Sequence, residues 1–490
     1  MEKLNLGEND KLMIKHEIQT EIYKRSFYDF LKFVAPLIKN IKWDWNWHHE
    51  YLCDILQAEI ERIDAGEKRK HHLCINVPPR TAKSLMVSVA LPIWTAIRNP
   101  NISFANLSYS QILSNDHSNL VVTILTHPDF KSYFNTDGEF DFVETQKAKN
   151  DFRLKNGFTR IASSILGSVL GRGGNVIVLD DPNSPKKVYS EKERHNTLEA
   201  WKNSIASRLN NPAVDIFIIV QQRLHLEDMT GFVMSEEQGE WQHICLPAEA
   251  SDKVNPIGLM KNYDNGLLWN SDLLNREVLA AHLNRMGSNT YANQLMQEVS
   301  AKGGNIIKEA WVKTLTLEKF LERCEVNGIK PRWDLFLDSA QTESKKNDPS
   351  GIMIACKIFN DVYVRKVIEK RLTMPDLLEA LKNIVTDYNI NRVFVEPKSN
   401  GKDIVFQLKR QTKFNVIELP SPTTDKTERL NGVSARIEAG RFTLIEDLSN
   451  DKIMEQLCFF PAVKHDEFCD LTGYAINKYL GTSSIKYAVG

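Results

Sequence analysis

The sequence predicts an α/β protein with two domains, a parallel-sheet domain followed by a mixed-sheet domain. Its 490 residues exceed the roughly 250–300 at which one hydrophobic core stops growing. Between residues 73 and 220, short β-branched runs alternate with helical stretches, as in a parallel sheet covered on both faces. From Trp333 onward the strands follow one another in hairpin order instead.

The alternation of strand-like and helix-like stretches changes near residues 250 and 330, which gives three predicted segments. Residues 1–250 form an N-terminal domain, and residues 329–490 form a C-terminal domain. Residues 251–328 combine a turn-rich stretch with one or two amphipathic helices, so we expect a linker or hinge there.

The composition excludes several classes of protein. Hydrophobic residues make up 42% of the chain and charged residues 26%, which is typical of a globular protein rather than a disordered or collagen-like one. The 62 Lys and Arg nearly balance the 63 Asp and Glu, so a polyanion must bind at a local patch. The seven scattered cysteines include no CxxC pair, and the N-terminus has no apolar leader. We therefore expect a soluble cytoplasmic protein with no membrane partner.

The expected elements of the first domain alternate regularly. Continuous apolar and β-branched runs predict strands over residues 73–77, 102–108, 175–181 and 214–222. Helical patterns lie between them, over residues 84–97 and 189–209. This alternation predicts parallel strands, because a parallel pair needs a long crossover connection.

The second domain opens with a meander. Residues 333–340, 351–359 and 361–372 are expected strands, and a polar Asn360-Asp361 turn joins the last two. A helix over residues 374–389 then leads into a strand over 392–397. Three meandering strands, a helix and a fourth strand form the opening topology of an RNase H-like domain.

The most informative stretch of the first domain is INVPPRTAKS, residues 75–84, where a strand passes through a loop into a helix. Lys83 and Ser84 lie where a phosphate-binding P-loop would end. The lysine could reach the β- and γ-phosphates, the hydroxyl could hold Mg²⁺, and the N–H groups of Arg80, Thr81 and Ala82 could face the phosphates. Val77 and Ala82 replace both motif glycines, so an ordinary helix start with an exposed lysine is the alternative.

A second motif strengthens the nucleotide interpretation. Four apolar residues end in Asp180 and Asp181, which is the form of a Walker B strand. We assign Asp180, with Ser84, to Mg²⁺ and Asp181 to the attacking water. Taken alone, the Asp-Asp-Pro sequence could be a turn or a helix cap. The two motifs together predict a P-loop ATPase domain of the RecA/ASCE type that binds ATP.

Three further elements are candidates with open alternatives. Arg172, on the glycine-rich loop 171–174, is either an arginine finger for a neighbouring subunit or a solvated turn residue. Gln222 follows an apolar strand and is either a sensor of the γ-phosphate or an exposed loop residue. An aromatic cluster that includes His49 could sandwich an adenine or could form the edge of a core; its members are Trp43, Trp45, Trp47, His48 and His49.

The C-terminal domain carries a second set of acids. Asp338 and Glu396 each end an apolar strand, while Asp466 and Asp470 would share one helix face at i,i+4 spacing. Converging carboxylates suit two Mg²⁺ or Mn²⁺ ions that hydrolyse a phosphodiester. Each acid alone could be a surface residue. Nearby cations are candidates for holding phosphates or for a solvated helix face, namely Lys398, Lys402, Lys409, Arg410 and Lys413.

With these motifs and their order in view, the chain resembles the large subunit of tailed-phage terminases. The resemblance covers most of residues 43–485 and rests on WHHEYL before VPPRTAKS, GRGGNVIVLDDP, IVQQRLHLEDMTG, FVEPKSNG and HDEFCDLTGYA. It implies an ATPase that translocates double-stranded DNA into a procapsid and an RNase H-like nuclease that cuts concatemers. The implied partners are a small terminase subunit, the portal protein and further copies in a ring. The implied location is the cytoplasm of an infected bacterium, transiently at the procapsid portal and not in the mature virion.

The resemblance places the ATPase motifs on Lys83, Ser84, Asp180 and Asp181, and the nuclease acids on Asp338, Glu396 and Asp470. Two departures are the missing P-loop glycines and an Asp, rather than a Glu, as the second Walker B acid. Whether Asp466 or Glu467 helps to bind metal stays open. A helicase-like ATPase and nuclease of DNA repair or recombination would share both sites, and a nucleotide-binding assembly protein is a third alternative.

Overall fold

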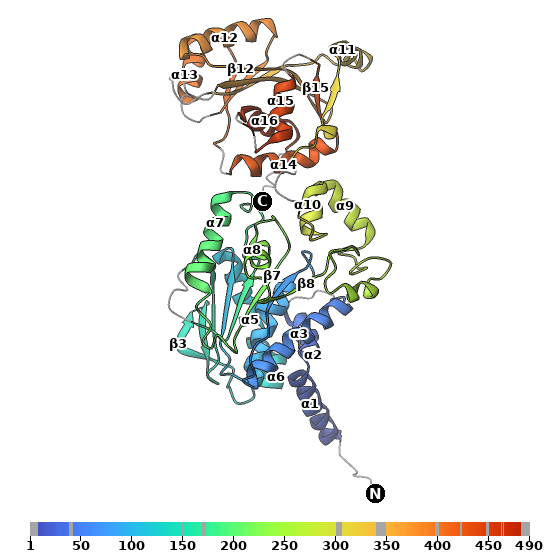
Figure 1. The fold of residues 1–490 in the computed structure, drawn as a ribbon, viewed down its shortest axis with the longest axis vertical. Helices are drawn as coiled ribbons and strands as arrows, with labels where there is room; N and C mark the ends of the chain where they lie inside the picture. The colour runs from blue at the N-terminus through green and yellow to red at the C-terminus, as the bar shows by residue number, and fades with distance from the viewer. Residues whose placement is uncertain are drawn as a thin grey trace. The chain divides into compact units, whose positions relative to one another are not determined.

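The computed structural model describes residues 8–38, 43–148, 150–167, 173–299, 306–339, 349–396, 401–421, 424–446, 450–461, 463 and 465–481. The chain divides into two compact units, coloured from blue to yellow-green and from yellow to red in Figure 1. Unit 1 comprises Met1–Ala281 and Thr290–Ser300, and unit 2 comprises His282–Asn289 and Ala301–Gly490.

Unit 1 is built on an eight-stranded sheet with the order β3-β4-β5-β2-β6-β7-β1-β8. Six strands from β5 to β8 along this order are parallel, and β3 and β4 form an antiparallel edge. The strands are β1 (His72–Asn76), β2 (Phe104–Ser108), β3 (Phe142–Ala148), β4 (Asp151–Leu154), β5 (Thr159–Ser164), β6 (Val176–Asp180), β7 (Ile216–Gln221) and β8 (Trp241–Cys245). The predicted parallel sheet is therefore confirmed, with β7 between the P-loop strand β1 and the Asp180 strand β6.

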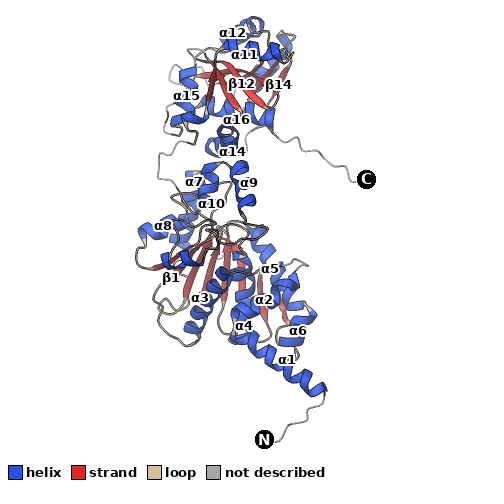
Figure 2. Cartoon of the chain, turned by 90° about the vertical axis from the view of Figure 1, so that its right-hand side faces the viewer, coloured by secondary structure: helices blue, strands red, loops and turns tan. Residues whose placement is uncertain are grey.

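Helices lie on both faces of this sheet (Figure 2). On one face, Leu179 and Ile219 pack against Trp201 and Phe232. The helices of unit 1 and of the connection to unit 2 are α1 (Glu8–Arg25), α2 (Phe27–Ile38), α3 (Trp47–Asp64), η1 (Leu85–Ala90), α4 (Leu91–Arg98), α5 (Gln111–Thr126), α6 (Pro128–Phe134), α7 (Glu191–Ala200), η2 (Trp201–Ile205), α8 (Met229–Glu236), η3 (Ile257–Asn262), α9 (Arg276–Met286) and α10 (Ser288–Gln294).

The helix expected over residues 84–97 is not one regular α-helix. It begins as the π-helix η1 and continues as α4, with Pro92 in the first turn of α4. Proline has no N–H to donate, so Pro92 removes one intrahelical hydrogen bond at the point where η1 passes into α4. A π-turn inside a helix is commonly found at a functional site.

Unit 2 contains a seven-stranded mixed sheet with the order β14-β13-β10-β11-β12-β15-β9. The strands β10, β11 and β12 form the predicted antiparallel meander, and β13 adds in parallel to β10. The strands are β9 (Lys313–Leu315), β10 (Asp334–Asp338), β11 (Ser350–Ile358), β12 (Asp361–Lys370), β13 (Arg392–Val395), β14 (Val416–Glu418) and β15 (Phe442–Ile445). The mixed sheet of the predicted C-terminal domain is thus confirmed.

Two groups of helices cover the two faces of this second sheet. Leu335 and Leu337 pack against α12 and α13, whereas Phe336 and Phe394 pack on the face of α14, α15 and α16. The helices of unit 2 are η4 (Glu309–Trp311), α11 (Leu317–Val326), α12 (Met374–Asp387), α13 (Gly401–Gln411), α14 (Lys426–Glu438), α15 (Asn450–Phe459) and α16 (Glu467–Leu480). Since side chains alternate along a strand, the residues two beyond Phe336 and Phe394 face α16 as well.

The segment predicted as a linker does not form a unit of its own. Its first part, through Ala281, belongs to unit 1, and residues 301–328 belong to unit 2, where they supply α11 and the edge strand β9. The predicted boundaries at 250 and 329, and a hinge between them, remain a proposal. Among the described helices, none is long and apolar enough to cross a bilayer.

Candidate active sites

The P-loop candidate leaves the end of β1 through residues 77–84. Arg80 and Ala82 adopt left-handed backbone conformations, with φ of 71° and 58°. Ala82 occupies the position of the second motif glycine, so the chain keeps a glycine-like backbone there without a glycine. The Thr81 hydroxyl donates a hydrogen bond to the Pro78 carbonyl oxygen (2.8 Å), which helps to hold this loop.

Lys83 lies between the ends of two neighbouring strands. Its Nζ donates to Asp181 Oδ1 (2.8 Å) and to Gln222 Oε1 (3.2 Å). Lys83 and Gln222 are each 7% exposed. The structure therefore brings together three residues that the sequence assigned to one nucleotide site, from the P-loop, from the end of β6 and from the end of β7.

Ser84 and Asp180 form the second pair of this site. The Ser84 hydroxyl donates to Asp180 Oδ1 (3.0 Å), and the Ser88 hydroxyl donates to Asp180 Oδ2 (2.8 Å). Ser88 was not predicted to lie here, although it is four residues after Ser84. Ser84 directly precedes η1 and Ser88 lies within it, so both hydroxyls lie beside the carboxylate of Asp180, which is fully buried.

The electrostatics of the Asp180 and Asp181 carboxyls are set mainly by burial. Burial raises the pKa of both groups, and the positive charge of Lys83 opposes that rise. His117 Nδ1 lies 3.6 Å from Asp180 Oδ2, but burial lowers the His117 pKa to about 4. A neutral imidazole adds no positive charge, so Lys83 is the cation that balances this pair of acids.

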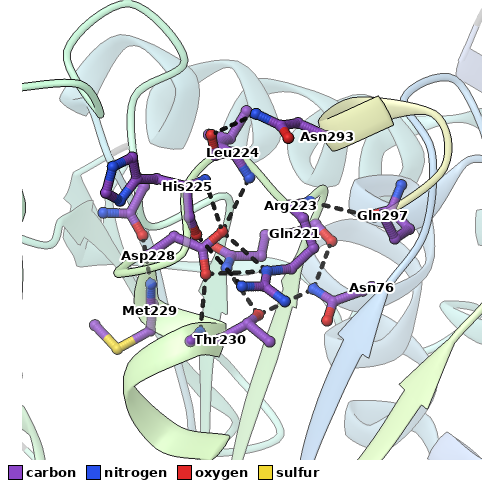
Figure 3. A network of polar contacts seen from close by, with 12 residues as sticks. Asn76, Gln221, Arg223, Leu224, His225, Asp228, Met229, Thr230, Asn293 and Gln297 are labelled. Atoms are coloured by element: carbon purple, nitrogen blue, oxygen red, sulfur yellow. Dashed lines mark hydrogen bonds and ion pairs between the residues drawn. The ribbon is translucent and has the colours of Figure 1, made fainter. Parts of the chain in front are cut away.

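The loop that follows Gln222 is fixed by a network of polar contacts (Figure 3). Arg223 Nε donates to both carboxylate oxygens of Asp228 (3.1 and 3.0 Å). Asp228 also accepts from the backbone of Leu224 (2.9 Å) and caps α8 at Gly231 (2.9 Å). The Arg223 N–H donates to Gln297 Oε1 (2.9 Å). Buried ion pairing of this kind holds a loop in one conformation, which positions Gln222.

The aromatic cluster around His49 is largely buried and reaches a distant part of the chain. His49 is 1% exposed, and its Nδ1 accepts from the Asn46 N–H (3.0 Å) as part of a capping box that begins α3. The His48 and His49 rings pack against Trp269, with ring centroids 5.5 and 5.0 Å apart. Among the described residues, several buried ring nitrogens of this cluster have no hydrogen-bond partner: Trp43 Nε1, Trp47 Nε1, both nitrogens of His48, His49 Nε2 and Trp269 Nε1. The structure thus places His49 inside a buried aromatic cluster at the start of α3. Arg172, the arginine-finger candidate, lies outside the described residues.

The second acid group is assembled in unit 2. One carboxylate oxygen from each of Asp338, Glu396 and Asp470 lies within 4.8 Å of the others. Asp338 ends β10, Glu396 directly follows β13, and Asp470 is in the first turns of α16. These are the three residues predicted to converge, and their common face follows from side-chain alternation along the strands.

The Asp338 carboxyl is strongly perturbed by its surroundings. Burial raises its pKa to about 8, and the nearby charge and hydrogen bond of Glu396 add to the rise. Tyr474 donates its hydroxyl to Glu396 Oε1 (2.9 Å). Oxygen donors that repel one another and share a proton suit a hard dication such as Mg²⁺ or Mn²⁺, which would replace the proton.

Two basic residues of α14 contact the Asp470 carboxylate. Arg429 forms an ion pair with Asp470 Oδ1, and Lys426 Nζ lies 3.2 Å from Asp470 Oδ2. Lys426 also pairs with Asp466, whose side chain is 34% exposed. Asp466 is thus beside the acid group but is not among the three residues whose donor oxygens converge. Its predicted role as a metal ligand remains a proposal.

The sequence placed the basic residues of this site on a different segment. Lys402, Lys409 and Arg410 are exposed on α13, Lys413 is exposed just beyond it, and Lys398 lies outside the described residues. Lys426 and Arg429 were missed, although the sequence holds a signal for them. Both lie in the first turns of α14, where cations are unfavourable for the helix dipole, so their presence indicates a nearby acidic partner.

Residues 335–478 match the family model of the terminase RNaseH-like domain. This stretch contains Asp338, Glu396 and Asp470 and most of unit 2. The match confirms the resemblance to the large subunit of tailed-phage terminases and the RNase H-like assignment of the C-terminal domain. No curated protein sequence matches the chain.

Several solved structures are similar in fold. The large terminase of a thermophilic bacteriophage is 11% identical, with a TM-score of 0.44 over 86% of this chain and 98% of that chain. The large terminase of bacteriophage HK97 is 10% identical, with a TM-score of 0.34 over 92% of this chain and 99% of that chain. The large terminase nuclease of thermophilic phage G20c with bound magnesium is 16% identical, with a TM-score of 0.28 over 37% and 100%.

Proposed function

We propose that this chain is the large subunit of a phage terminase, which uses ATP hydrolysis to move double-stranded DNA into a procapsid and cuts concatemeric DNA with a metal-dependent endonuclease. The observation that carries the proposal is the convergence of Asp338, Glu396 and Asp470 from two strands and a helix. They converge inside the stretch that matches the terminase RNaseH-like domain.

In unit 1, each contact around Lys83 supports a role in ATP hydrolysis. The Lys83 ammonium would bind the β- and γ-phosphates, and Gln222, held by the Arg223 network, would sense the γ-phosphate. Ser84 and Asp180 form the oxygen donor pair that would hold Mg²⁺, which neutralises phosphate charge when bound. Asp181 would orient the attacking water. The N–H groups of residues 80–82 would face the phosphates, His49 would contact the adenine, and Arg172 would act as an arginine finger.

In unit 2, the acids would hold Mg²⁺ or Mn²⁺, which activates water and stabilises a leaving oxygen in phosphodiester hydrolysis. Asp338, Glu396 and Asp470 are the proposed ligands, with Asp466 as a further candidate. Arg429 and Lys426 would help to position the DNA backbone next to them, because both carry positive charge at the edge of the acid group.

The proposed partners are double-stranded DNA, the portal protein, a small terminase subunit and further copies of this chain in a ring on the procapsid. The proposed place of action is the cytoplasm of an infected bacterium. The chain carries a formal net charge of −1, so its DNA contact must be local rather than global.

A reciprocal pair of substitutions tests the proposal in the full chain. Asp338→Asn should abolish Mn²⁺-dependent cleavage of plasmid DNA and leave ATP turnover intact, whereas Lys83→Ala should abolish ATP turnover and leave a folded unit 2. Asp387→Asn and Lys70→Ala make the same chemical changes at exposed positions and should keep both activities. Undiminished cleavage by Asp338→Asn would refute the nuclease assignment, and undiminished ATP turnover by Lys83→Ala would refute the nucleotide site.

A repair or recombination enzyme would pass the same two tests. Packaging separates the alternatives: with procapsids and ATP, the chain should make DNA resistant to added nuclease, and Lys83→Ala should remove that protection. ATP-dependent unwinding or resection of DNA without any packaging would favour the helicase-like alternative instead.

A further inference from the structure

A second group of metal-binding residue types lies in unit 2, outside the acid group already described. Glu369, His465 and Glu467 each place one donor atom within 4.8 Å of the other two. Glu369 is near the end of β12, and the other two flank the start of α16. The group combines one imidazole and two carboxylates, in contrast to the three carboxylates around Asp338.

The register of the sheet places the Asp338 group and the Glu369 group on different strands. Asp338 pairs with Gly351 across β10 and β11, and Gly351 pairs with Glu369 across β11 and β12. Directly paired residues of antiparallel strands project to the same face of a sheet. Asp338 and Glu369 therefore lie on the same face, on the two strands that flank Gly351. Two strand spacings separate their backbones by about 10 Å.

Helix α16 lies over that glycine and supplies one acid to each group. A Cβ atom on Gly351 would lie 2.8 Å from Glu467 Cβ, so only glycine leaves room for the helix at this point. Glu467 and Asp470 are spaced i,i+3 and therefore occupy one face of α16. Asp470 joins Asp338 and Glu396, whereas Glu467 joins Glu369 and His465.

The Glu467 carboxylate is buried, accepts a hydrogen bond from its own backbone N–H, and makes long contacts to neighbouring side chains. Its side chain is 7% exposed, with His465 Nδ1 at 3.8 Å from Oε1 and Gln456 Nε2 at 3.4 Å from Oε2. Lys452 Nζ lies 2.9 Å from Glu369 Oε2, but its own side chain is 56% exposed. A buried carboxylate with such long contacts would gain more from a coordinated cation than from these partners.

We propose that Glu369, His465 and Glu467 form a second divalent-cation site, distinct from the Asp338 group. The imidazole nitrogen favours a borderline ion such as Zn²⁺ over Mg²⁺, which prefers oxygen ligands. The two groups share no ligand, and their strand residues Asp338 and Glu369 stand two strands apart in the sheet, with Gly351 between them. The second ion would thus fix the start of α16, and with it Asp470, without belonging to the nuclease centre. This inference does not depend on the proposed function.

Cobalt binding to the full chain tests the site without reference to DNA cleavage. Co²⁺ bound through a His465 nitrogen should give a visible absorption band that Zn²⁺ displaces. The band should persist in Asp338→Asn, disappear in His465→Ala and be strongly weakened in His465→Gln. Circular dichroism and thermal unfolding of the metal-free variants should match the parent chain. Loss of the band in Asp338→Asn but not in His465→Ala would overturn the proposal, as would the absence of Co²⁺ and Zn²⁺ binding in a folded parent chain.

Lys452 provides an opposite-sign test of the same site. Because its ammonium competes with a cation for Glu369, Lys452→Ala should tighten Zn²⁺ binding several-fold, measured by calorimetry in the Asp338→Asn background. Lys402→Ala, which removes an exposed lysine of the same unit, should leave the affinity unchanged. If His465 instead forms only ion pairs with the two acids, Lys452→Ala will not tighten Zn²⁺ binding, and the metal site is refuted.

Discussion

The two groups of converging acids, one in each unit, differ in the side chains that lie next to their carboxylates. In unit 1, Asp180 and Asp181 are balanced by Lys83 and by the hydroxyls of Ser84 and Ser88. In unit 2, Arg429 and Lys426 contact Asp470, while the charge and hydrogen bond of Glu396 raise the pKa of Asp338. The comparison indicates that Lys83 opposes the burial of the first pair of acids, whereas a divalent cation between Asp338 and Glu396 would relieve their repulsion in the second group.

The largest expected effect of a single substitution at one pH concerns Lys83. Lys83→Ala removes the cation that faces the buried Asp180 carboxyl and the partly buried Asp181 carboxyl, so we expect the free energy of unfolding of unit 1 to fall by about 3 kcal/mol. Chemical denaturation of the full chain, followed by a probe in unit 1, measures the change. Lys70→Ala, at an exposed position before β1, should change it little, and an unaltered stability of Lys83→Ala would contradict the assigned balance of charge.

The next effect concerns the basic residues of α14. Arg429→Ala leaves the buried Asp470 carboxylate with Lys426 alone, so unit 2 should lose about 2 kcal/mol of stability in the absence of metal. Saturating Mn²⁺ should restore most of this loss, because the ion replaces the missing positive charge. Arg436→Ala, farther along the same helix, should show neither the loss nor the recovery. Equal stability of Arg429→Ala with and without Mn²⁺ would contradict a metal site beside Asp470.

The pH dependence of stability should differ between parent chain and Asp338→Asn. The folded state holds a proton on Asp338 up to a pKa of about 8, above the ordinary value of 3.8. Stability from this group is complete below the ordinary pKa and is lost as the pH rises towards 8. With metal chelated, the parent should lose up to about 1.4 kcal/mol per pH unit relative to Asp338→Asn between pH 5 and 8. A difference that does not change with pH would show that Asp338 is ionised throughout.

The smallest expected effect concerns the P-loop backbone. Ala82→Gly should relieve a left-handed conformation worth about 1–2 kcal/mol, offset by the greater freedom of glycine in the unfolded chain, about 0.4–1 kcal/mol. We expect a net gain of about 0.5–1 kcal/mol, measured by thermal unfolding. Ala213→Gly, at an exposed position without positive φ, should destabilise slightly instead. A loss of stability in Ala82→Gly would contradict the strained-loop interpretation.

The two sheets and the convergence of the acids could be predicted from the sequence. The charged residues that contact those acids could not. Asp338 and Glu396 were predictable because each ends an apolar strand, and side-chain alternation then fixes the face on which they lie. Lys426, Arg429 and Glu369 were not predicted, since their partners come from distant segments that only tertiary packing brings together. The left-handed backbone conformations of Arg80 and Ala82 could not be predicted either, because neither residue ordinarily favours positive φ.

The sequence pattern also did not predict the local geometry of the helix over residues 84–97. Residues 84–97 have the apolar content of a buried helix, and that content does not distinguish a π-helix from an α-helix. Ser88 lies within η1, and its hydroxyl joins that of Ser84 at Asp180. The prediction for His49 was incomplete for a related reason: the capping role of Nδ1 appears only once the start of α3 is known.

The most direct test of the central claim is the anomalous scattering of Mn²⁺ in crystals of the full chain. We expect a strong peak coordinated by Asp338, Glu396 and Asp470, which Asp338→Asn removes together with DNA cleavage. If the parent chain cleaves DNA with Mn²⁺ while the ion is bound elsewhere and these three carboxylates have no peak between them, unit 2 does not cleave DNA by the means described.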